Sequence, residues 1–165
     1  MTEAVYVSGG SNVDVERNLR IAARELRRRF PGVVFSRCYR NESVGFDGPA
    51  FVNFCAAFPL AGSIDEVKAA LEEIEALCGR PPAAPKWEPR QMDLDIVLVG
   101  ERIADAPVTL PRPQLLKWAF MLGPLAEIAP DALHPLERRT IGELWADFDR
   151  AAHPMQVVPV DLAQA

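Results

Sequence analysis

Two segments of the chain carry apolar residues at helical spacing. In residues 15–30, apolar side chains recur every three or four positions, which predicts an amphipathic helix. A second helix is expected after Ser63-Ile-Asp-Glu66, because a Ser and a Glu at this spacing can cap each other's backbone N–H groups. Gly79 is suited to end it. The two stripes consist of Val15, Leu19, Ala22, Leu26 and Phe30, and of Ile64, Val67, Leu71, Ile74 and Leu77.

Four further segments have the apolar or alternating character of β-strands. They are residues 4–8, 33–39, 51–59 and 92–99. Between the first strand and the first helix, Gly9-Gly10-Ser11-Asn12 is expected to form a turn, because glycine and small polar residues favour turns.

The resulting order βαββαβ predicts a ferredoxin-like α+β sandwich with an antiparallel sheet. Both helices would cover one face of the sheet and leave the opposite face free. Extra C-terminal loops and helices are expected, with a short helix near 114–121 and another at 140–148. We interpret residues 1–165 as a single domain, with an ordered core at about 4–150 and a loose tail at 151–165.

The strand at 92–99 contains two carboxylates, Asp93 and Asp95. Alternation places both on one face, roughly 7 Å apart. Because like charges repel and Asp is a poor strand former, a divalent cation bound between them is the simplest compensation. An exposed, solvated pair is the alternative interpretation. The apolar residues that alternate with them are expected to face the helices, and they are Met92, Leu94, Ile96 and Leu98.

Composition limits the classes of partner. The chain has 165 residues, a net charge of −5, and no apolar run long enough to span a bilayer. An acidic chain is poorly suited to nonspecific nucleic-acid binding, so neither nucleic acid nor membrane is expected as a partner. Three widely spaced cysteines in apolar surroundings, with no evident secretory signal, are typical of a cytoplasmic protein. We expect a monomer that acts on small molecules.

Cations and an aromatic residue complete the candidate site. Arg80, Lys86 and Arg90 lie in a Pro-rich loop before the acidic strand, and Arg side chains match phosphate oxygens well. On the strand at 51–59, Phe51 and Asn53 share a face, as a flat nitrogen-rich heterocycle would require. The alternative is an ordinary cross-strand ring beside a solvated amide. Carboxylates, metal and adjacent cations together predict phosphoryl or pyrophosphoryl transfer.

These residues resemble the pterin pyrophosphokinase family, whose members act on 6-hydroxymethyl-7,8-dihydropterin in folate biosynthesis. The resemblance runs from about residue 4 to residue 148 and is strongest at Trp87-Glu-Pro-Arg90-Gln-Met-Asp93-Leu-Asp95-Ile96. It also includes Gly-Ser-Asn at 10–12, Phe51-Val-Asn53, Glu75-Ala-Leu-Cys-Gly79-Arg80, and the segment from Phe120 to Pro130. The resemblance implies transfer of pyrophosphate from ATP, the co-substrate, to the pterin hydroxymethyl group, with release of AMP.

The resemblance also implies roles for individual residues. Asp93 and Asp95 would bind two Mg²⁺ ions, and Arg80 and Arg90 would contact the polyphosphate. Asn53 would meet the edge of the pterin ring. The other implied pterin contacts are Phe51 and Phe120, which would stack on the ring, the loop from Asn41 to Val44, and Trp87, which would close over the site. The implied nucleotide contacts are Glu75, Arg80, Lys86, Trp87, Arg90, Ile96, Thr109 and Arg112.

The chain departs from the family pattern where cations normally contact ATP. Arg112 stands where members usually have His, Pro82 replaces a basic loop residue, and Trp118 stands where an Arg is common. A pterin-binding paralogue with an altered phosphate donor, acceptor or activity is therefore the second hypothesis. An RNA-binding sheet, which shares the βαββαβ order, is the third, but its sheet face would need to be basic rather than acidic.

Overall fold

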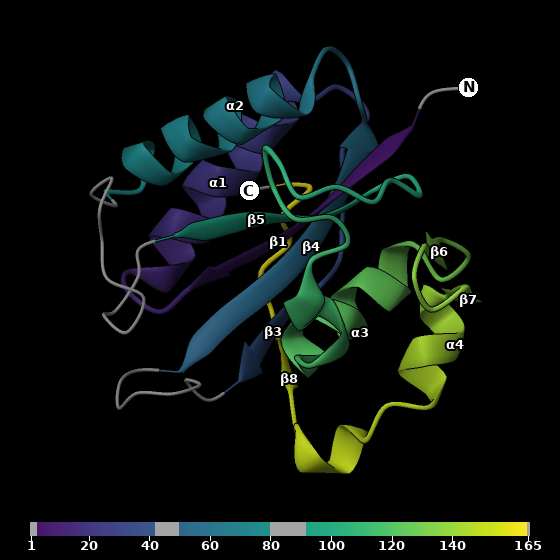
Figure 1. The fold of residues 1–165 in the computed structure, drawn as a ribbon. Coiled ribbons are helices and arrows are strands. Elements are labelled where there is room, and N and C mark those ends of the chain that lie inside the picture. Colours follow the sequence, from purple (N-terminus) through teal and green to yellow (C-terminus); the bar gives the residue numbers. More distant parts are fainter. Residues whose placement is uncertain (1–2, 42–49, 80–91, 165) are drawn as a thin grey trace.

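The computed structural model describes residues 3–41, 50–79 and 92–164, and it confirms the ferredoxin-like α+β arrangement. Within these residues, six strands form an antiparallel sheet of order β5-β1-β4-β3-β8, with β2 also paired to β4 (Figure 1). The elements of the βαββαβ unit are β1 (Ala4–Ser11), α1 (Val15–Arg29), β2 (Val34–Phe35), β3 (Cys38–Asn41), β4 (Phe51–Pro59), α2 (Ile64–Leu77) and β5 (Asp93–Val99).

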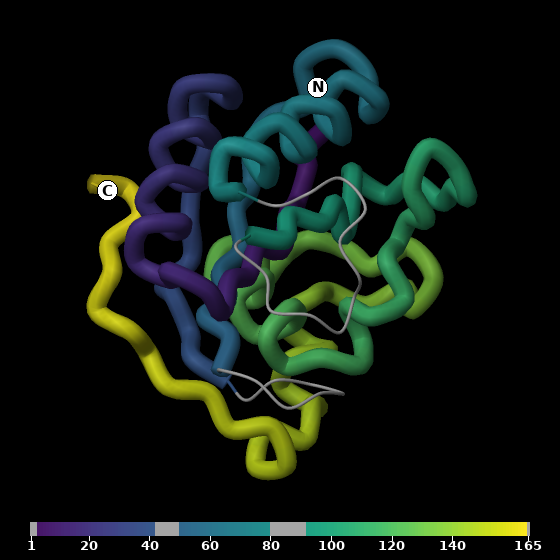
Figure 2. The backbone as a smooth tube through the Cα atoms, turned by 90° about the vertical axis from the view of Figure 1, so that its left-hand side faces the viewer, coloured from purple at the N-terminus to yellow at the C-terminus, as the bar shows by residue number. Residues whose placement is uncertain are grey.

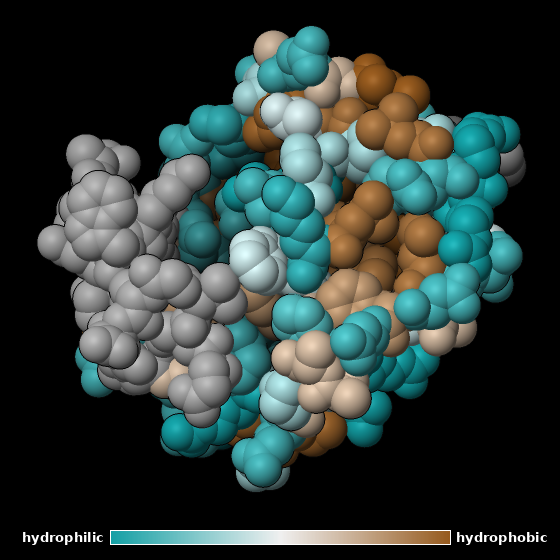
Figure 3. Space-filling model, turned by 60° about the horizontal axis from the view of Figure 1, so that its bottom comes forward, coloured by the Kyte–Doolittle hydropathy of each residue, from teal (hydrophilic) through white to brown (hydrophobic). Residues whose placement is uncertain are grey.

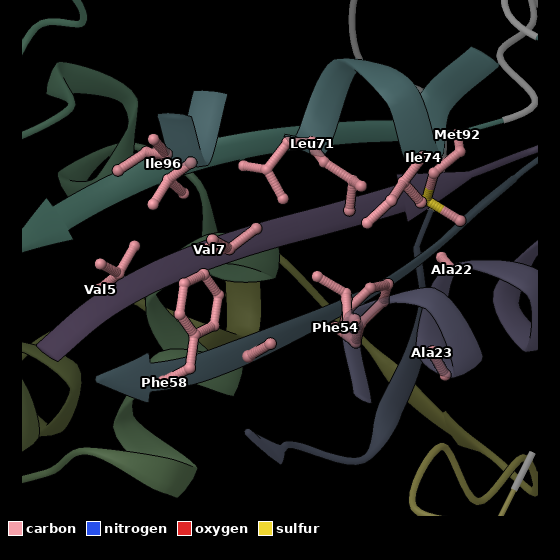
Figure 4. Close-up of a cluster of buried hydrophobic side chains, with 14 of the residues drawn as sticks. Val5, Val7, Ala22, Ala23, Phe54, Phe58, Leu71, Ile74, Met92 and Ile96 are labelled. Atoms are coloured by element: carbon pink, nitrogen blue, oxygen red, sulfur yellow. The ribbon is translucent and has the colours of Figure 1, made fainter. Parts of the chain in front are cut away.

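Helices α1 and α2 cover one face of the sheet, as the apolar stripes predicted. Figure 4 shows side chains of α1 and α2 packed against Val5, Val7 and Phe54 of the sheet, and all three of these strand residues are buried. The predicted capping of α2 is confirmed, because the Ser63 Oγ accepts from the Glu66 N–H at 3.1 Å and Glu66 in turn accepts from the Ser63 N–H. Gly79 follows the helix with a φ of +94°, which glycine adopts without strain.

The opposite face of the sheet was predicted to be free, and this prediction is wrong. The C-terminal region packs there as α3 (Ala119–Ile128) and α4 (Ile141–Ala146), with the hairpin β6 (Leu133–His134) and β7 (Arg139–Thr140) beside them (Figure 1). A second apolar cluster joins Met121 and Leu125 of α3 to Cys55 and Val97 of the sheet. On the side viewed in Figure 3, hydrophobic side chains reach the surface among hydrophilic ones.

The helix expected at 140–148 corresponds to α4, which Thr140 and Glu143 cap as Ser63 and Glu66 cap α2. Near 114–121 the chain instead forms a 3₁₀ helix at Pro113–Leu116, and α3 then begins at Ala119 and continues through Pro124 to Ile128. None of the helices in the described residues combines the length and apolarity needed to cross a bilayer.

A β-bulge in β5 changes the facing of its last residues. Tyr6 of β1 pairs with Leu98 and Val7 pairs with Ile96, so Val97 is the extra residue. The alternation therefore shifts by one position, and Leu98 lies in the cluster under α3, whereas Leu94 and Ile96 lie under α2. The prediction that Leu98 shares a face with them is wrong for this reason.

Residues 151–165 were expected to form a loose tail, and the structure corrects this too. After a 3₁₀ turn at Arg150–Ala152, β8 (Gln156–Val158) pairs with β3 and extends the sheet. Leu162 is buried in the core between the sheet and α1, and its carbonyl accepts a hydrogen bond from Arg27 of α1. Figure 2 shows the yellow C-terminal segment passing along the sheet toward α1. With only three residues, in a segment bounded by Pro154 and Pro159, this strand is too short to show a pattern by itself, so only its pairing partner reveals it.

His134 makes the stability of the fold depend on pH. Its side chain is 2% exposed, and its Nδ1 accepts hydrogen bonds from the N–H groups of Leu136 and Glu137 at 3.3 and 3.1 Å. Burial lowers the pKa of His134 from the usual 6.5, and the nearby Glu137 charge opposes this only in part. Because the unfolded chain takes up the proton more readily, the free energy of unfolding should fall as the pH drops below 6.5.

We therefore expect chemical denaturation to show declining stability between pH 7.5 and 5.5, a window above the ordinary pKa range of carboxylates. His134→Gln should lower stability at pH 7.5 and flatten this dependence. His153→Gln removes the other histidine, which is exposed, and should leave the dependence intact. An equally steep decline in His134→Gln would contradict the assignment.

Candidate functional site

A row of residues across four strands forms the centre of the candidate site. Gly10 of β1 pairs with Asp93 on one side and with Asn53 on the other, and Asn53 pairs with Tyr39 of β3. Directly paired residues point to the same face of a sheet, here the face on which α3 packs. Two strand spacings separate Asp93 from Asn53, about 10 Å. Since Gly10 has no side chain, the amide of Asn53 can lie close over its backbone.

The two glycines of β1 were predicted to form a turn, but they lie within the strand. The strand continues to Ser11, so the backbones of Gly9 and Gly10 are paired with β4 and β5 instead of being available to cradle a phosphate. A Cβ at Gly9 would lie 2.4 Å from Cζ of Phe54, and one at Gly10 would lie 2.7 Å from Nδ2 of Asn53. Close packing on both faces thus requires glycine at both positions. Sequence reasoning missed Gly10 as a site residue because it took the glycine pair for a turn signal.

The side-chain oxygen of Asn53 can accept a hydrogen bond from a ligand. Its side chain is 5% exposed, and its Oδ1 has no hydrogen-bond partner among the described residues. A buried acceptor left in this state costs about 1–3 kcal/mol, which a ligand N–H would recover. Phe51, two residues earlier on β4, points to the same face and pairs with Asn41 at the end of β3. The sheet therefore brings together the three pterin contacts predicted on β3 and β4.

Helix α3 is tied to this face by Glu127. The carboxylate accepts hydrogen bonds from the hydroxyl of Tyr39 and from the backbone N–H of Arg37, the latter at 2.9 Å. Burial raises the pKa of Tyr39 to about 12, with further contributions from the hydrogen bond and charge of Glu127, so the hydroxyl stays a donor. At the other end of α3, the Met121 carbonyl lies 3.5 Å from Sγ of Cys55. These contacts fix the helix over β3 and β4.

Phe120, the predicted second stacking residue, is in the first turn of α3 next to Met121. It is partly buried, and its ring stacks on that of Trp118 with centroids 5.9 Å apart and an interplanar angle of 12°. Trp118 stands where the family often has an arginine, and here it replaces a charge with a second aromatic ring.

Asp93 and Asp95 line a pocket of about 530 Å³ between edge strand β5 and helix α2. Glu75 of α2 contributes to its wall and accepts a hydrogen bond from the Leu94 N–H at 2.8 Å. This bond satisfies a backbone donor on the outer edge of β5 and holds the strand against α2. Ile96 also lines the pocket, although its side chain is 4% exposed and belongs mainly to the core.

Arg112 reaches the same pocket from the loop after β5. Its Nη1 lies 3.5 Å from Oδ1 of Asp95, and its backbone N–H donates to the carbonyl of Val97, the bulged residue, at 3.0 Å. Thr109, the other predicted nucleotide contact in this loop, is exposed. Five predicted site residues lie outside the described residues: Val44, Arg80, Lys86, Trp87 and Arg90.

Fold and site together define an α+β domain with a carboxylate pair on edge strand β5 and, on the same face of the sheet, a buried amide and an aromatic ring on β4. The model of the family described as 7,8-dihydro-6-hydroxymethylpterin-pyrophosphokinase matches residues 6–130. The chain is 37% identical over 153 residues to the 2-amino-4-hydroxy-6-hydroxymethyldihydropteridine pyrophosphokinase of Synechocystis sp., covering 90% of this chain and 77% of the relative. Over 151 residues it is also 37% identical to the enzyme of the same name from Pseudomonas aeruginosa, covering 88% and 92%.

Among solved structures, wild-type HPPK-DHPS of Plasmodium falciparum with pteroate matches with a TM-score of 0.69. The match covers 88% of this chain but 44% of that longer chain, and at 9% identity it supports the fold alone. The family model and the curated relatives decide the family. This chain belongs to the 7,8-dihydro-6-hydroxymethylpterin-pyrophosphokinase family, as its motifs predicted.

The bond from the Leu94 N–H to Glu75 gives a local test of this geometry. We expect Glu75→Ala to lower the free energy of unfolding by about 1 kcal/mol and to leave the Leu94 amide without its acceptor. Hydrogen exchange at Leu94 should then become faster. Glu75→Gln retains an acceptor oxygen and should protect this amide far better than Glu75→Ala, and equal exchange rates in the two variants would contradict the bond.

Proposed function

We propose that this chain performs the reaction of its family on the sheet face that carries Asp93, Gly10 and Asn53. The reaction is transfer of pyrophosphate from ATP to the hydroxymethyl group of 6-hydroxymethyl-7,8-dihydropterin, in folate biosynthesis. The observation that carries the assignment of the site is the cross-strand register. Through Gly10, this register aligns Asp93 of the acidic pair with Asn53, whose buried side-chain oxygen has no hydrogen-bond partner among the described residues.

The pterin would lie between the rings of Phe51 and Phe120. Asn53 presents an acceptor to the ring edge, and an amide can both donate to and accept from a pterin. The aromatic rings supply stacking that needs no charge. Because Trp118 stacks on Phe120, the second ring would be held in place by a third aromatic group behind it.

The donor set also fits magnesium. Mg²⁺ is usually held by one or two carboxylates together with substrate phosphates, and Asp93 and Asp95 supply two hard oxygen ligands at the mouth of the pocket. No cluster of three or more potential ligand side chains occurs in the described part of the chain, so the phosphates and water would complete the coordination. When bound, two Mg²⁺ ions would neutralise phosphate charge and polarise the transferred group.

The chain's own residues then position two substrates for one displacement. The hydroxymethyl oxygen forms a bond to the β-phosphorus of ATP, and the bond from that phosphorus to the oxygen bridging to the α-phosphate breaks, so AMP leaves. Asn53, Phe51 and Phe120 would fix the pterin, while the pocket between β5 and α2 would receive the nucleotide. Holding the attacking oxygen in line with the leaving group supplies much of the rate enhancement.

We further propose that the whole chain is a single domain that acts as a cytoplasmic monomer. The two apolar clusters lie on opposite faces of the same sheet, as suits a single domain. All three cysteines are buried as free thiols, as suits a reducing compartment.

Asp95→Ala tests the catalytic assignment. It should reduce AMP release, measured with dihydropterin, ATP and Mg²⁺, by at least about a hundredfold, because a charge that positions the metal and phosphates is removed. Pterin binding should remain measurable by calorimetry. Asp131→Ala, which changes an exposed carboxylate near β6, is the charge-matched control and should retain activity. Normal turnover in Asp95→Ala would exclude the metal site.

Phe51→Ala tests the proposed stacking of the pterin on Phe51. It should weaken pterin binding by about 1–3 kcal/mol, the range measured for bases stacked on aromatic rings. Phe51→Tyr keeps the ring face and should bind nearly as well as the wild-type protein. If Phe51→Ala binds pterin normally in a calorimetric titration, the ring serves packing and not recognition.

A further inference from the structure

The described charges of the pocket at β5 are unbalanced. Four carboxylates line it, from Glu72, Glu75, Asp93 and Asp95, against two cations, Lys68 and Arg112. Lys68 forms an ion pair with Glu72 on its own helix. Among the described residues, Arg112 is therefore the cation that faces the aspartate pair, at 3.5 Å from Asp95.

The contact between Arg112 and Asp95 is an ion pair that lacks the geometry of a strong hydrogen bond. Charge-assisted bonds from a guanidinium to a carboxylate are about 2.7–2.9 Å long, clearly shorter than the 3.5 Å observed here. The side chains of Arg112 and Asp95 are 31% and 24% exposed, so neither is locked in the interior. Charge attraction, and not a fixed bidentate pairing, holds the guanidinium beside Asp95.

Arg112 also has a side-chain donor that no described residue uses. Its Nε is buried and has no hydrogen-bond partner within the described residues. A guanidinium offers a planar set of donors that matches phosphate oxygens. The backbone of Arg112 is meanwhile fixed to the carbonyl of Val97, so the side chain can turn while its root stays beside β5.

We propose that Arg112 is a resident counter-cation of Asp95, which competes with Mg²⁺ for this carboxylate and turns to the nucleotide phosphates when metal and nucleotide bind together. The proposal rests on the metal site proposed above. In the absence of ligand, the guanidinium relieves repulsion between Asp93 and Asp95. A metal ion that arrives alone must displace it, whereas metal carried by a polyphosphate gives it a new partner. The pocket would thereby favour the metal–nucleotide complex over the free ion.

The proposal predicts opposite effects on two affinities. Arg112→Gln removes the charge and shortens the side chain, so Mn²⁺ alone, followed by electron paramagnetic resonance, should bind about three- to tenfold more tightly than to the wild-type protein. A non-hydrolysable ATP analogue with excess Mg²⁺, followed by calorimetry, should bind about three- to tenfold more weakly, because one phosphate contact is lost.

Two variants control for charge and for position. Arg112→Lys retains the cation and should keep the Mn²⁺ affinity close to that of the wild-type protein. Arg24→Gln changes the net charge equally from an exposed position on α1 and should alter neither affinity. In an Asp95→Asn background, Arg112→Gln should no longer improve Mn²⁺ binding, since the carboxylate under competition is absent.

The possible outcomes distinguish a failure of the counter-cation role of Arg112 from a failure of the proposed metal site. Equal Mn²⁺ affinity in Arg112→Gln and wild-type protein, or weaker affinity in the variant, would overturn the counter-cation role while leaving the metal site standing. Failure of both proteins to bind Mn²⁺ even with the nucleotide analogue present would overturn the metal site itself. The proposal would be supported if Arg112→Gln binds Mn²⁺ in the absence of nucleotide, whereas the wild-type protein binds Mn²⁺ only when nucleotide is present.

Discussion

The pairing of β1 with two neighbours at once is the constraint on which the site depends. Because β1 lies between β4 and β5, one residue, Gly10, sets the relative position of Asp93 and Asn53. A slip of one residue in either pairing would send one of these side chains to the opposite face, among the apolar residues under α1 and α2. The buried pattern of Val5, Val7 and Phe54 excludes such a slip, so the core secures the register of the polar row.

Two irregular features of the sheet shape the surroundings of the candidate site. The absence of a side chain at Gly10 leaves room for the Asn53 amide over β1, while the bulge at Val97 ends the regular alternation of β5. Beyond the bulge, Leu98 turns to the cluster under α3, and the Val97 carbonyl becomes available to the backbone of Arg112. The irregularity therefore serves both packing and placement of a cation at the pocket.

Helix α3 covers one part of the second face of the sheet. Its apolar residues cover the part of the face around Cys55, whereas Glu127 ties it to β3 through Tyr39 and Arg37. The remainder of this face holds the polar row and Phe51. The face that the βαββαβ pattern alone left free is thus partly core, and the C-terminal region supplies the residues that pack on it.

Local pattern in the sequence was sufficient for α1, α2 and α4, for the order of elements βαββαβ, for the acidic pair and for the family, because period, capping and a dense motif are all local properties. It also placed Phe51 and Asn53 on the face shared with Asp93, since the alternation of side chains along a strand can be read without knowing which strand pairs with it. It was insufficient for the strand at residues 156–158, the extension of β1 through two glycines, the bulge at Val97 and the contact of Arg112 with Asp95. Each of these depends on a hydrogen-bond or charge partner far away in the chain, and only the folded sheet brings those partners together.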